Sequence, residues 1–590
     1  MRALGYRTVD ALVDWLCDAS QPPLRRAEPD EMAQRLAGLD TAPAPFDDAL
    51  KTLFDDVLPF TSRAAHPRFF AYVPFAGTWP AALGDFVASA CNVYAGSWQE
   101  AAGPTQLELT LLDWFKDWVG YPREAGGSLQ TGGSGANLTA LACAREALVG
   151  AMRDDLVVYV SDQAHSSIAR AARILGFRPD QVRVLPVADD LHLEPAALAA
   201  AIAADESAGR KPFLAVANAG ATSAGTVDPI ADLAALCRER GVWLHVDAAY
   251  GGFAVLTARG RAALGDLSLA DSLTLDPHKW LYQPYECGCL LVRDGRALRR
   301  AFEIHSDYLR DSEVDAEEVN FADYGLQLTR STRAFKLWLS LRTFGVDAFR
   351  HAIDRTLDLA ELAARRIEES SVLELVVPPS LGIVCFRRRD EPDAHVDGLV
   401  EALERSGVGL ISSTRVHGRP ALRLCILNHT SGAGDVEAVL EFLETAAWRE
   451  APETYERHAP VPTPLFSRLD PREAEALGEL AAVRSVAAGE TLVQQWETDR
   501  SLFVLDEGFV DVVHAGQVVK TLGPGDYFGE IAALEWGAGF ARSRVATVVA
   551  HDDARLLVLD QAALAELFHR FPRLEDEIRR TAHERLRETR

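Results

Sequence analysis

Short apolar runs alternate with alanine-rich helical segments through the middle of the chain, between about residues 126 and 292. Short runs of this kind, bounded by polar residues or glycine, are typical of buried strands. Strands that alternate with helices indicate a mostly parallel sheet that is covered by helices on both faces. The predicted strands are residues 156–160, 183–187, 213–217, 242–246, 272–275 and 289–292.

The segments on either side of this region follow different patterns. Residues 8–16 have the periodicity of a helix, and proline-broken segments follow up to Pro80. A long helix begins at Arg333 and continues beyond Phe344 into a smaller region that mixes strands and helices. Its strands include residues 382–386 and 421–427, which predicts an α+β subdomain.

The last part of the chain has short β runs in place of the alternating pattern. Residues 451–464 hold four prolines and few apolar residues, a composition typical of a linker. Beyond it, runs at 491–493, 501–505, 509–514, 517–522, 545–549 and 555–559 predict a small β-barrel or jelly roll. The fold class is therefore α/β with an appended β domain. The predicted divisions are a helical N-terminal segment (1–80), a large domain (81–344), a small subdomain (345–447), a linker (448–463) and the β domain (464–590).

Composition and net charge restrict the classes of function that the chain can have. At 590 residues the chain is too long for one core, and 48% apolar with 25% charged residues is ordinary for a globular protein. The net charge of −26 argues against a nucleic-acid partner, whose phosphates need basic patches. We expect a cytoplasmic protein without membrane contact, because neither a signal-peptide core nor a bilayer-length apolar run occurs. The eight cysteines form no CxxC pair, so we expect reduced, mostly buried thiols and no metal site.

Two of the predicted strands lead to residues with complementary chemistry. The strand over 242–246 delivers the carboxylate of Asp247, and the strand over 272–275 leads to the amine of Lys279. Adjacent strand ends would place both groups at one edge of the sheet. An amine that forms a Schiff base, opposite a carboxylate that pairs with a pyridinium nitrogen, is what pyridoxal phosphate needs from a protein. The sequence therefore predicts pyridoxal 5'-phosphate as cofactor.

A glycine-rich turn and a loop histidine add to this prediction. Residues 130–137 precede a clear helix, whose N-terminus and small residues Gly133 and Ser134 suit a phosphate group. No lysine follows these glycines, which argues against a nucleotide P-loop. His165 comes just after the strand over 156–160.

The order of these features along the chain resembles that of the fold-type I pyridoxal phosphate enzymes. The resemblance is specifically to the group II decarboxylases, which include aromatic L-amino-acid decarboxylase. It covers about residues 1–447 and includes the segments 66–72, 161–167, 245–250 and 277–280.

The resemblance implies a role for each site residue. Lys279 would hold the cofactor covalently, Asp247 would pair with its pyridine nitrogen, and His165 would stack on its ring and later donate a proton. The remaining cofactor contacts implied are the phosphate ligands Gly133, Ser134 and His278, with Ala249 on the ring face opposite the histidine and Thr222 on a nearby loop.

Two further implications concern charge and assembly. Asp276 stands where the animal enzymes usually carry asparagine, which adds a negative charge near the phosphate and weakens the case for a direct contact. Members of this group are obligate homodimers whose subunits share active sites. The N-terminal helix would then wrap the partner chain, although packing within one chain explains its apolar face equally well.

The cofactor alone does not fix the reaction. Tyr308 lies ahead of an acidic stretch that ends near Tyr324, and this region resembles the family's mobile catalytic loop. In the family, the tyrosine of that loop helps to protonate the carbanion, whereas aldehyde-forming relatives typically carry phenylalanine there. Tyr308 and His165 thus favour decarboxylation of an L-amino acid to the amine and CO2. Tyr72 lies in a segment that resembles the pocket wall of aromatic decarboxylases and is the candidate substrate contact. Acidic or diamino substrates and an aldehyde synthase reaction stay open.

The end of the chain, about residues 464–590, resembles cyclic nucleotide-binding domains. In that family a glutamate accepts a hydrogen bond from the ribose and an arginine neutralises the cyclic phosphate. Glu530 and Arg544 take those places, and the amides of Gly529, Glu530 and Ile531 could add contacts. The loop between them is longer than usual, and Arg542 competes as the phosphate ligand. Cyclic AMP or cyclic GMP is the candidate ligand and regulator; the alternative is a nucleotide-sensing scaffold whose decarboxylase half is inert.

Overall fold

The protein is described by a computed structural model, which covers residues 1–18, 21–39, 41–74, 76–303, 318–389, 392, 395–446, 478–494, 501–514, 517–530, 546–571, 574 and 578. The chain forms two compact units, Met1–Trp448 and Arg449–Arg590. The first unit is α/β and the second is built on antiparallel strands, which confirms the predicted fold class.

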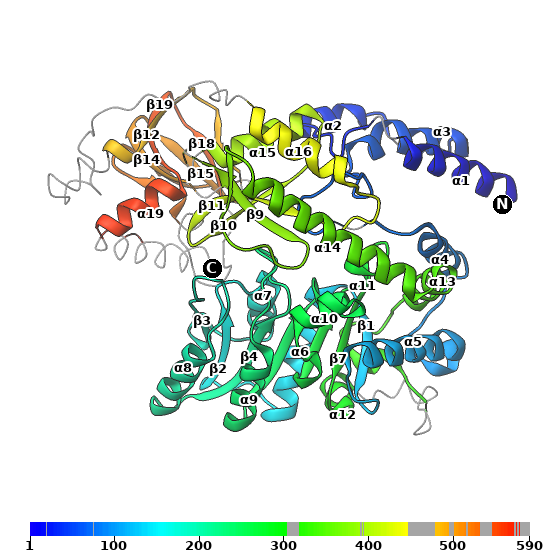
Figure 1. Ribbon diagram of the computed structural model, residues 1–590. Coiled ribbons are helices and arrows are strands. Elements are labelled where there is room, and N and C mark those ends of the chain that lie inside the picture. The colour runs from blue at the N-terminus through cyan, green and yellow to red at the C-terminus, as the bar shows by residue number, and fades with distance from the viewer. Residues whose placement is uncertain are drawn as a thin grey trace. The chain divides into compact units, whose positions relative to one another are not determined.

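A seven-stranded sheet lies at the centre of the first unit, in the order β1-β7-β6-β5-β4-β2-β3 (Figure 1). Strand β7 runs antiparallel to both of its neighbours, and the other neighbouring pairs are parallel. Every residue of β2, β5 and β6 is buried, as expected for strands that are covered on both faces. The mostly parallel sheet is therefore confirmed. Its strands are β1 (Gly126–Gln130), β2 (Leu156–Ser161), β3 (Val182–Leu185), β4 (Lys211–Asn218), β5 (Trp243–Ala248), β6 (Ser272–Leu275) and β7 (Gly288–Val292).

Helices cover this sheet on both faces. The chain crosses the sheet in one direction from β1 to β3 and in the opposite direction from β3 to β6. Right-handed crossovers then place α6 and α7 on one face and α8 and α9 on the other. Consistent with this, α6 packs against α7 and α12, whereas α8 packs against α9. The helices are α5 (Trp98–Val119), α6 (Gly133–Leu148), α7 (Ser166–Ile174), α8 (Pro195–Ser207), α9 (Ile230–Arg240), α10 (Ala258–Leu264), α11 (Pro277–Trp280) and α12 (Gly295–Phe302).

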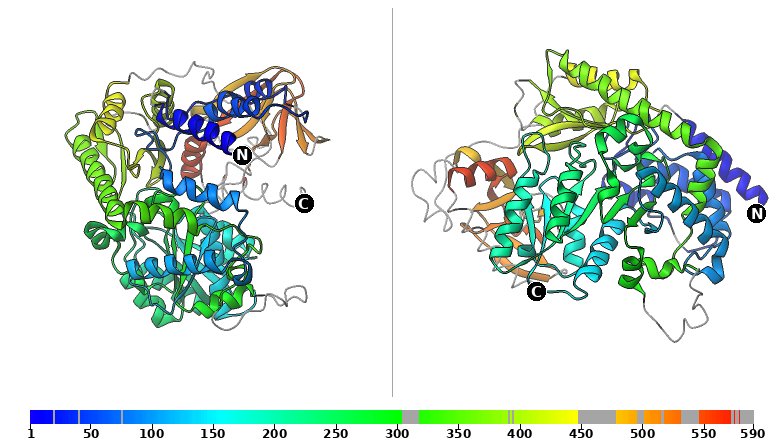
Figure 2. Two further views of the ribbon diagram at one scale, coloured as in Figure 1. Left: turned by 90° about the vertical axis from the view of Figure 1, so that its right-hand side faces the viewer. Right: turned by 60° about the horizontal axis from the view of Figure 1, so that its bottom comes forward.

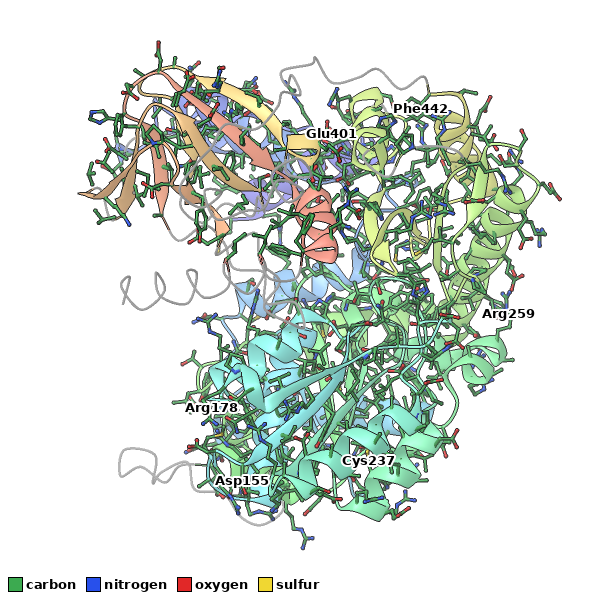
Figure 3. The ribbon with its side chains drawn as sticks, turned by 90° about the vertical axis from the view of Figure 1, so that its left-hand side faces the viewer. Asp155, Arg178, Cys237, Arg259, Glu401 and Phe442 are labelled. Carbon is green, nitrogen blue, oxygen red and sulfur yellow. The ribbon has the colours of Figure 1, made fainter. Side chains whose placement is uncertain are left out.

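A smaller α+β subdomain follows the large domain. Its antiparallel sheet has the order β10-β11-β9-β8, and Figure 3 labels Glu401 and Phe442 on two of its helices and Cys237 in the large domain. Phe70, from the N-terminal part of the chain, is fully buried in the core of this subdomain, and its amide donates to the carbonyl of Leu410. The elements are α13 (Ala334–Phe344), α14 (Val346–Glu368), β8 (Leu373–Leu375), β9 (Ile383–Arg388), α15 (Val396–Ser406), β10 (Ser412–Val416), β11 (Arg419–Cys425) and α16 (Ala433–Thr445).

The N-terminal helices are α1 (Arg2–Cys17), α2 (Pro29–Arg35), α3 (Phe46–Thr52) and α4 (Trp79–Ala90). The predicted helix over 8–16 is part of α1, which lies at the edge of the unit (Figure 2). None of its residues is buried, and Leu4, Tyr6, Val13 and Leu16 are exposed. Val9, Leu12 and Trp15 are half-buried, so within one chain the apolar face of α1 is only partly covered.

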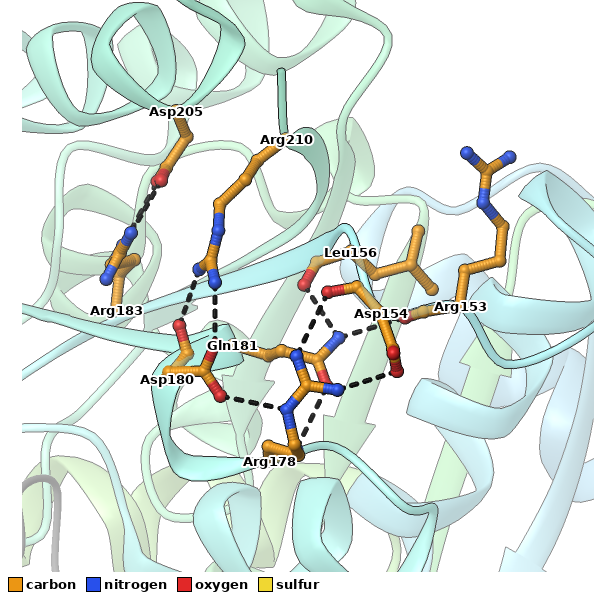
Figure 4. A network of polar contacts seen from close by, with 9 residues as sticks. All are labelled: Arg153, Asp154, Leu156, Arg178, Asp180, Gln181, Arg183, Asp205 and Arg210. Atoms are coloured by element: carbon orange, nitrogen blue, oxygen red, sulfur yellow. Dashed lines mark hydrogen bonds and ion pairs between the residues drawn. The ribbon is translucent and has the colours of Figure 1, made fainter. Parts of the chain in front are cut away.

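A network of ion pairs lies at the amino edge of the sheet, before β2, β3 and β4 (Figure 4). Arg178 pairs with Asp154 at 2.6 Å and with Asp180 at 3.1 Å, and Arg210 pairs with Asp180 at 2.6 Å. Beneath them the fully buried Gln181 donates to the carbonyls of Arg153 and Leu156, both at 3.0 Å. These contacts connect the starts of neighbouring strands.

In the part of the second unit that the structure describes, the strands form two four-stranded antiparallel sheets, in the orders β12-β19-β14-β17 and β13-β18-β15-β16. This arrangement agrees with the predicted jelly roll, while the predicted linker lies outside the described residues. No helix among those described is long and apolar enough to cross a membrane. The elements are β12 (Ala482–Val486), β13 (Thr491–Val493), β14 (Leu502–Glu507), β15 (Val510–His514), β16 (Gln517–Leu522), β17 (Tyr527–Phe528), β18 (Thr547–Ala550), β19 (Ala554–Leu559) and α19 (Gln561–Arg570).

Candidate active site

A cavity of about 280 Å³ lies at the carboxyl edge of the seven-stranded sheet. Residues at or just after the ends of β1, β2, β4, β5 and β6 line it, which is where α/β sheets bind ligands. The cavity brings together eight residues that the sequence predicted for one site: Gly133, Ser134, His165, Thr222, Asp247, Ala249, His278 and Lys279.

The carboxylate of Asp247, near the end of β5, is held at both of its oxygens. Its Oδ1 accepts a hydrogen bond from the amide of Ala249 at 3.1 Å, and its Oδ2 accepts one from Asn137 Nδ2 at 2.8 Å. Both donors are neutral, so they fix the orientation of the carboxylate without cancelling its charge. The group can therefore pair with a cation in the cavity.

A chain of buried hydrogen bonds lies behind this carboxylate. Asn137 Oδ1 accepts from His245 Nε2 at 3.0 Å and from Thr274 Oγ1 at 2.7 Å, and His245 Nδ1 lies 2.8 Å from Ser272 Oγ. Complete burial lowers the pKa of His245 to about 4, because water no longer solvates the imidazolium. The ring is therefore neutral near pH 7, with its Nε2 proton on the side of Asn137.

The register of two parallel strands explains why these groups meet. His245 and Asp247 are two residues apart on β5, so their side chains lie on the same face of the sheet. They pair in register with Ser272 and Thr274 of β6. These four buried polar side chains are therefore neighbours on one face of the sheet, and Asn137 of α6 bonds to three of them.

His165 precedes α7 and caps its first turn. Its Nδ1 accepts a hydrogen bond from the amide of Ser167 at 3.2 Å and lies 2.8 Å from the Ser167 hydroxyl. That hydroxyl accepts from Asn137 at 2.8 Å, so its own proton is free to be donated to Nδ1. The neutral ring of His165 therefore carries its proton on Nε2. Desolvation by the cavity walls lowers the pKa of His165, which favours this neutral form near pH 7.

Lys279 lies on the short helix α11, directly after β6. Its Nζ is 2.9 Å from Asp276 Oδ2, and Asp276 is only 1% exposed. His278 Nδ1 lies 2.7 Å from the carbonyl oxygen of Cys287, and burial lowers the pKa of His278. The amine predicted to bind a cofactor therefore has a carboxylate as its direct neighbour.

The turn between β1 and α6 suits an anion. Gly132 has φ +82° and precedes the helix without offering a side-chain cap to the first amides of α6. A Cβ atom at Gly133 would come within 2.8 Å of Asp276 Oδ2 and 3.0 Å of the Cβ of Ala249, so any larger residue would displace its neighbours. The uncapped amides of a 16-residue helix thus face the cavity, as phosphate binding requires.

Other predicted residues are not part of this cavity. Tyr72 does not line it; the residue is 68% exposed, and its carbonyl accepts a hydrogen bond from Arg423. Tyr308 lies outside the described residues. In the second unit, Gly529 and Glu530 directly follow β17, and Glu530 is 2% exposed. Ile531, Arg542 and Arg544 lie outside the described residues.

The sequence interpretation missed the residues that support Asp247. One signal was available: His245, Ser272 and Thr274 are polar residues that alternate with apolar ones inside strands predicted to be buried. Buried polar side chains of this kind need partners, so they indicate a network. The cavity is also lined by Asp276, which was expected near the phosphate, and by residues to which no role had been assigned: Thr131, Gly132, Asn137, Asn218, Gly220, Tyr250, Tyr285 and Glu286.

Comparisons with known proteins agree with this geometry. Residues 29–389 match the pyridoxal-dependent decarboxylase conserved domain, and residues 483–571 match the cyclic nucleotide-binding domain. The chain is 39% identical to an aromatic-L-amino-acid decarboxylase of Bacillus atrophaeus, over 72% of this chain and 91% of the relative. It is 32% identical to tryptophan decarboxylase 1 of Oryza sativa subsp. japonica, over 72% and 89%. The crystal structure of Oryza sativa TDC with PLP and tryptamine superposes with a TM-score of 0.72 at 31% identity, over 75% of this chain and 96% of the other.

The residues in the cavity fit pyridoxal 5'-phosphate. They include a primary amine on Lys279, an oriented carboxylate on Asp247 and an uncapped helix start at Gly133. Family matches across more than half of the chain and the chemistry of the cavity thus lead to the same conclusion. The chain belongs to the pyridoxal-dependent decarboxylases, as a pyridoxal phosphate-dependent carboxy-lyase of the aromatic-L-amino-acid decarboxylase type that continues into a cyclic nucleotide-binding domain.

Proposed function

We propose that the chain decarboxylates an aromatic L-amino acid to the corresponding amine and CO2. The observation that carries this proposal is the convergence of Lys279, Asp247 and His165 in one cavity. Pyridoxal 5'-phosphate, when bound, supplies an electron sink for the electrons that the departing carboxyl group leaves behind.

Asp247 is proposed to hold a proton on the pyridine nitrogen. Its carboxylate is fixed by Ala249 and Asn137, so it can accept a hydrogen bond without first reorienting. His245 supports this role as a neutral group, because a cation at its position would compete for the negative charge of Asp247.

His165 is proposed to pack against the cofactor ring and to deliver a proton to the product carbon. Its Nδ1 is occupied by Ser167, which leaves Nε2 as the nitrogen that holds the transferable proton. Gly133 and Ser134 would bind the phosphate through the first amides of α6, with His278 beside them, while Ala249 and Thr222 would contact the ring.

The substrate side of the site is proposed to be completed by a second copy of the chain. Helix α1 has no buried residue, and its exposed apolar residues include Leu4, Tyr6 and Leu16. Tyr72 is exposed in a single chain as well, so a partner subunit could complete a pocket around it.

The divisions at residues 80, 344, 447 and 463 and the cytoplasmic location stay predictions. Eight free cysteines, six of them buried, are consistent with a reducing compartment.

The test is release of CO2 and amine by the cofactor-loaded protein against a panel of L-amino acids, with Lys279→Ala as the blank. Stoichiometric CO2 and amine from tryptophan, tyrosine or phenylalanine would support the proposal. Release from glutamate or a diamino acid would contradict the aromatic assignment, and CO2 accompanied by aldehyde would contradict the amine product. The Tyr308→Phe variant separates the amine product from the aldehyde product more sharply. If the tyrosine hydroxyl helps to protonate the product carbon, the variant should release more aldehyde relative to amine than the wild type.

We further propose that the second unit binds a cyclic nucleotide and alters the decarboxylation rate. The family match over residues 483–571 and the burial of Glu530 support it, with Gly529, Ile531 and Arg544 as further ligands. Calorimetric titration with cyclic AMP and cyclic GMP, alongside rates with and without each, tests both parts. Binding without a change in rate would leave a sensor that is uncoupled from the enzyme. Binding to a protein without any turnover would favour the nucleotide-sensing scaffold.

A further inference from the structure

Asp276 is a buried acid for which the proposed reaction has no assigned use. It directly follows β6, lines the cavity and is 1% exposed. A buried carboxylate is costly unless it is paired. Its Oδ2 lies 2.9 Å from the Nζ of Lys279 and 3.6 Å from His278 Nε2, so Lys279 is its close partner.

The second oxygen of Asp276 has no such partner. Asp276 Oδ1 is buried without a hydrogen bond to any described residue. The start of α6 lies against the same carboxylate, since a Cβ at Gly133 would come within 2.8 Å of Oδ2. The negative charge of Asp276 is therefore placed between the reactive lysine and the helix start that faces the cavity.

We propose that Asp276 is a positioning residue that acts as the counter-ion of the Lys279 nitrogen and favours its protonated form, both free and linked to the cofactor. The inference rests on the proposed function. A carboxylate at hydrogen-bond distance stabilises a positive charge on that nitrogen, most strongly where water is excluded. Asparagine at this position would keep the size of the side chain and lose the charge.

The other titratable groups around Asp276 and Lys279 leave a pH range in which the protonation of the lysine nitrogen can be followed. Burial lowers the pKa values of His165 and His278, so both rings stay neutral above pH 7. Burial raises the pKa of Tyr285 and of the nearby thiols, so these groups stay neutral below pH 9. The carboxylates of Asp247 and Glu286 line the same cavity. The titratable groups that interact electrostatically with Asp276 or Lys279 include His165, His278, Tyr285, Cys287, Cys289 and Cys425.

The test is a spectrophotometric pH titration of the full-length, cofactor-loaded protein, because the absorbance of the lysine-linked cofactor reports the proton on its nitrogen. Asp276→Asn should lower the midpoint by about one pH unit or more, a tenfold or larger loss of proton affinity. Asp162→Asn is the matched control, since Asp162 is an exposed loop carboxylate near His165 that is bonded to Gln163, and its midpoint should equal that of the wild type. Equal midpoints for wild type and Asp276→Asn, or equal shifts in both variants, would overturn the inference.

A second measurement covers the case in which Asp276→Asn does not retain the cofactor. Acetylation of Lys279 by acetic anhydride at pH 7.5, followed by mass spectrometry of the cofactor-free full chain, should be about tenfold faster in Asp276→Asn, because only the unprotonated amine reacts. Equal rates would again overturn the inference. Failure of the proposed function looks different: the wild type itself would show no absorbance band of a lysine-linked cofactor.

Discussion

The two edges of the seven-stranded sheet use similar polar side chains in opposite ways. At the carboxyl edge, Asp247, His245 and Asn137 are buried, and Asn137 bonds to both of the others. At the amino edge, the side chain of Arg178 is 46% exposed and that of its partner Asp154 is 90% exposed (Figure 4). Buried polar contacts are costly to break, whereas exposed ion pairs contribute little because water and salt screen them. The two edges therefore differ in the burial of these polar side chains more than in the type of contact that the side chains make.

The largest effect is expected for Asp247→Asn, which keeps the size of the side chain and removes its charge. CO2 release should fall by about 10²–10³-fold, by analogy with the loss of one preorganised electrostatic contact. Steady-state kinetics checks this, with bound cofactor measured by absorbance. Asp154→Asn makes the same substitution at the amino edge and should leave the rate unchanged. A near-normal rate in Asp247→Asn would contradict the role assigned to its charge.

Asn137→Ala should destabilise the first unit, although it removes only side-chain hydrogen bonds and none between the strand backbones. It removes partners from Asp247, His245 and Thr274 at once, and leaving buried polar groups unpaired costs about 2–4 kcal/mol in total. Urea unfolding followed by circular dichroism measures the change. Asp154→Asn again serves as the control, with a change of less than about 0.5 kcal/mol. Equal stabilities of the two variants would mean that burial does not distinguish the edges.

His245 should make stability depend on pH below neutrality. Its pKa is lowered to about 4 in the folded protein, against an ordinary value of 6.5, so the unfolded chain binds more protons between these values. Stability should therefore rise with pH across this window, by up to about 1.4 kcal/mol per pH unit, and fall as the pH drops from 6.5 towards 4. Urea unfolding between pH 4.5 and 6.5 checks the slope. His245→Asn should flatten it, and an unchanged slope would assign the dependence to other groups.

The smallest losses of stability are expected for two neighbouring residues of the amino-edge network, one buried and one exposed. Gln181→Ala removes a buried donor from two carbonyl groups and should cost about 1–3 kcal/mol. Arg178→Ala breaks exposed pairs with Asp154 and Asp180 and should cost less than about 1 kcal/mol. Urea unfolding of both variants is the measurement. An arginine variant less stable than the glutamine variant would contradict the claim that buried contacts contribute more than exposed ones.

The sequence interpretation predicted the catalytic fold from local patterns, and it named eight of the residues that line the cavity from polar strand ends and from the family resemblance. Apolar runs in β2, β4 and β5 were recognisable as buried strands, and Asp247 and Lys279 stand out as polar residues at strand ends. The supporting residues escaped it because Asn137 is 110 residues from Asp247, and nothing local to either residue specifies their contact. Tyr72 was predicted for the pocket from resemblance, yet within one chain it does not line the cavity.

The sequence alone determined the order of the elements, the candidate chemistry at each strand end and the kinship with two families. These depend on residue types at short spacings, which are properties of the chain itself. Only the tertiary structure decided which charges face one another: the contact of Asp276 with Lys279, the neutral state of His245 and the fixed tautomer of His165. Such interactions depend on distance and on the exclusion of water. Both arise only when strands and helices from separate parts of the chain pack together.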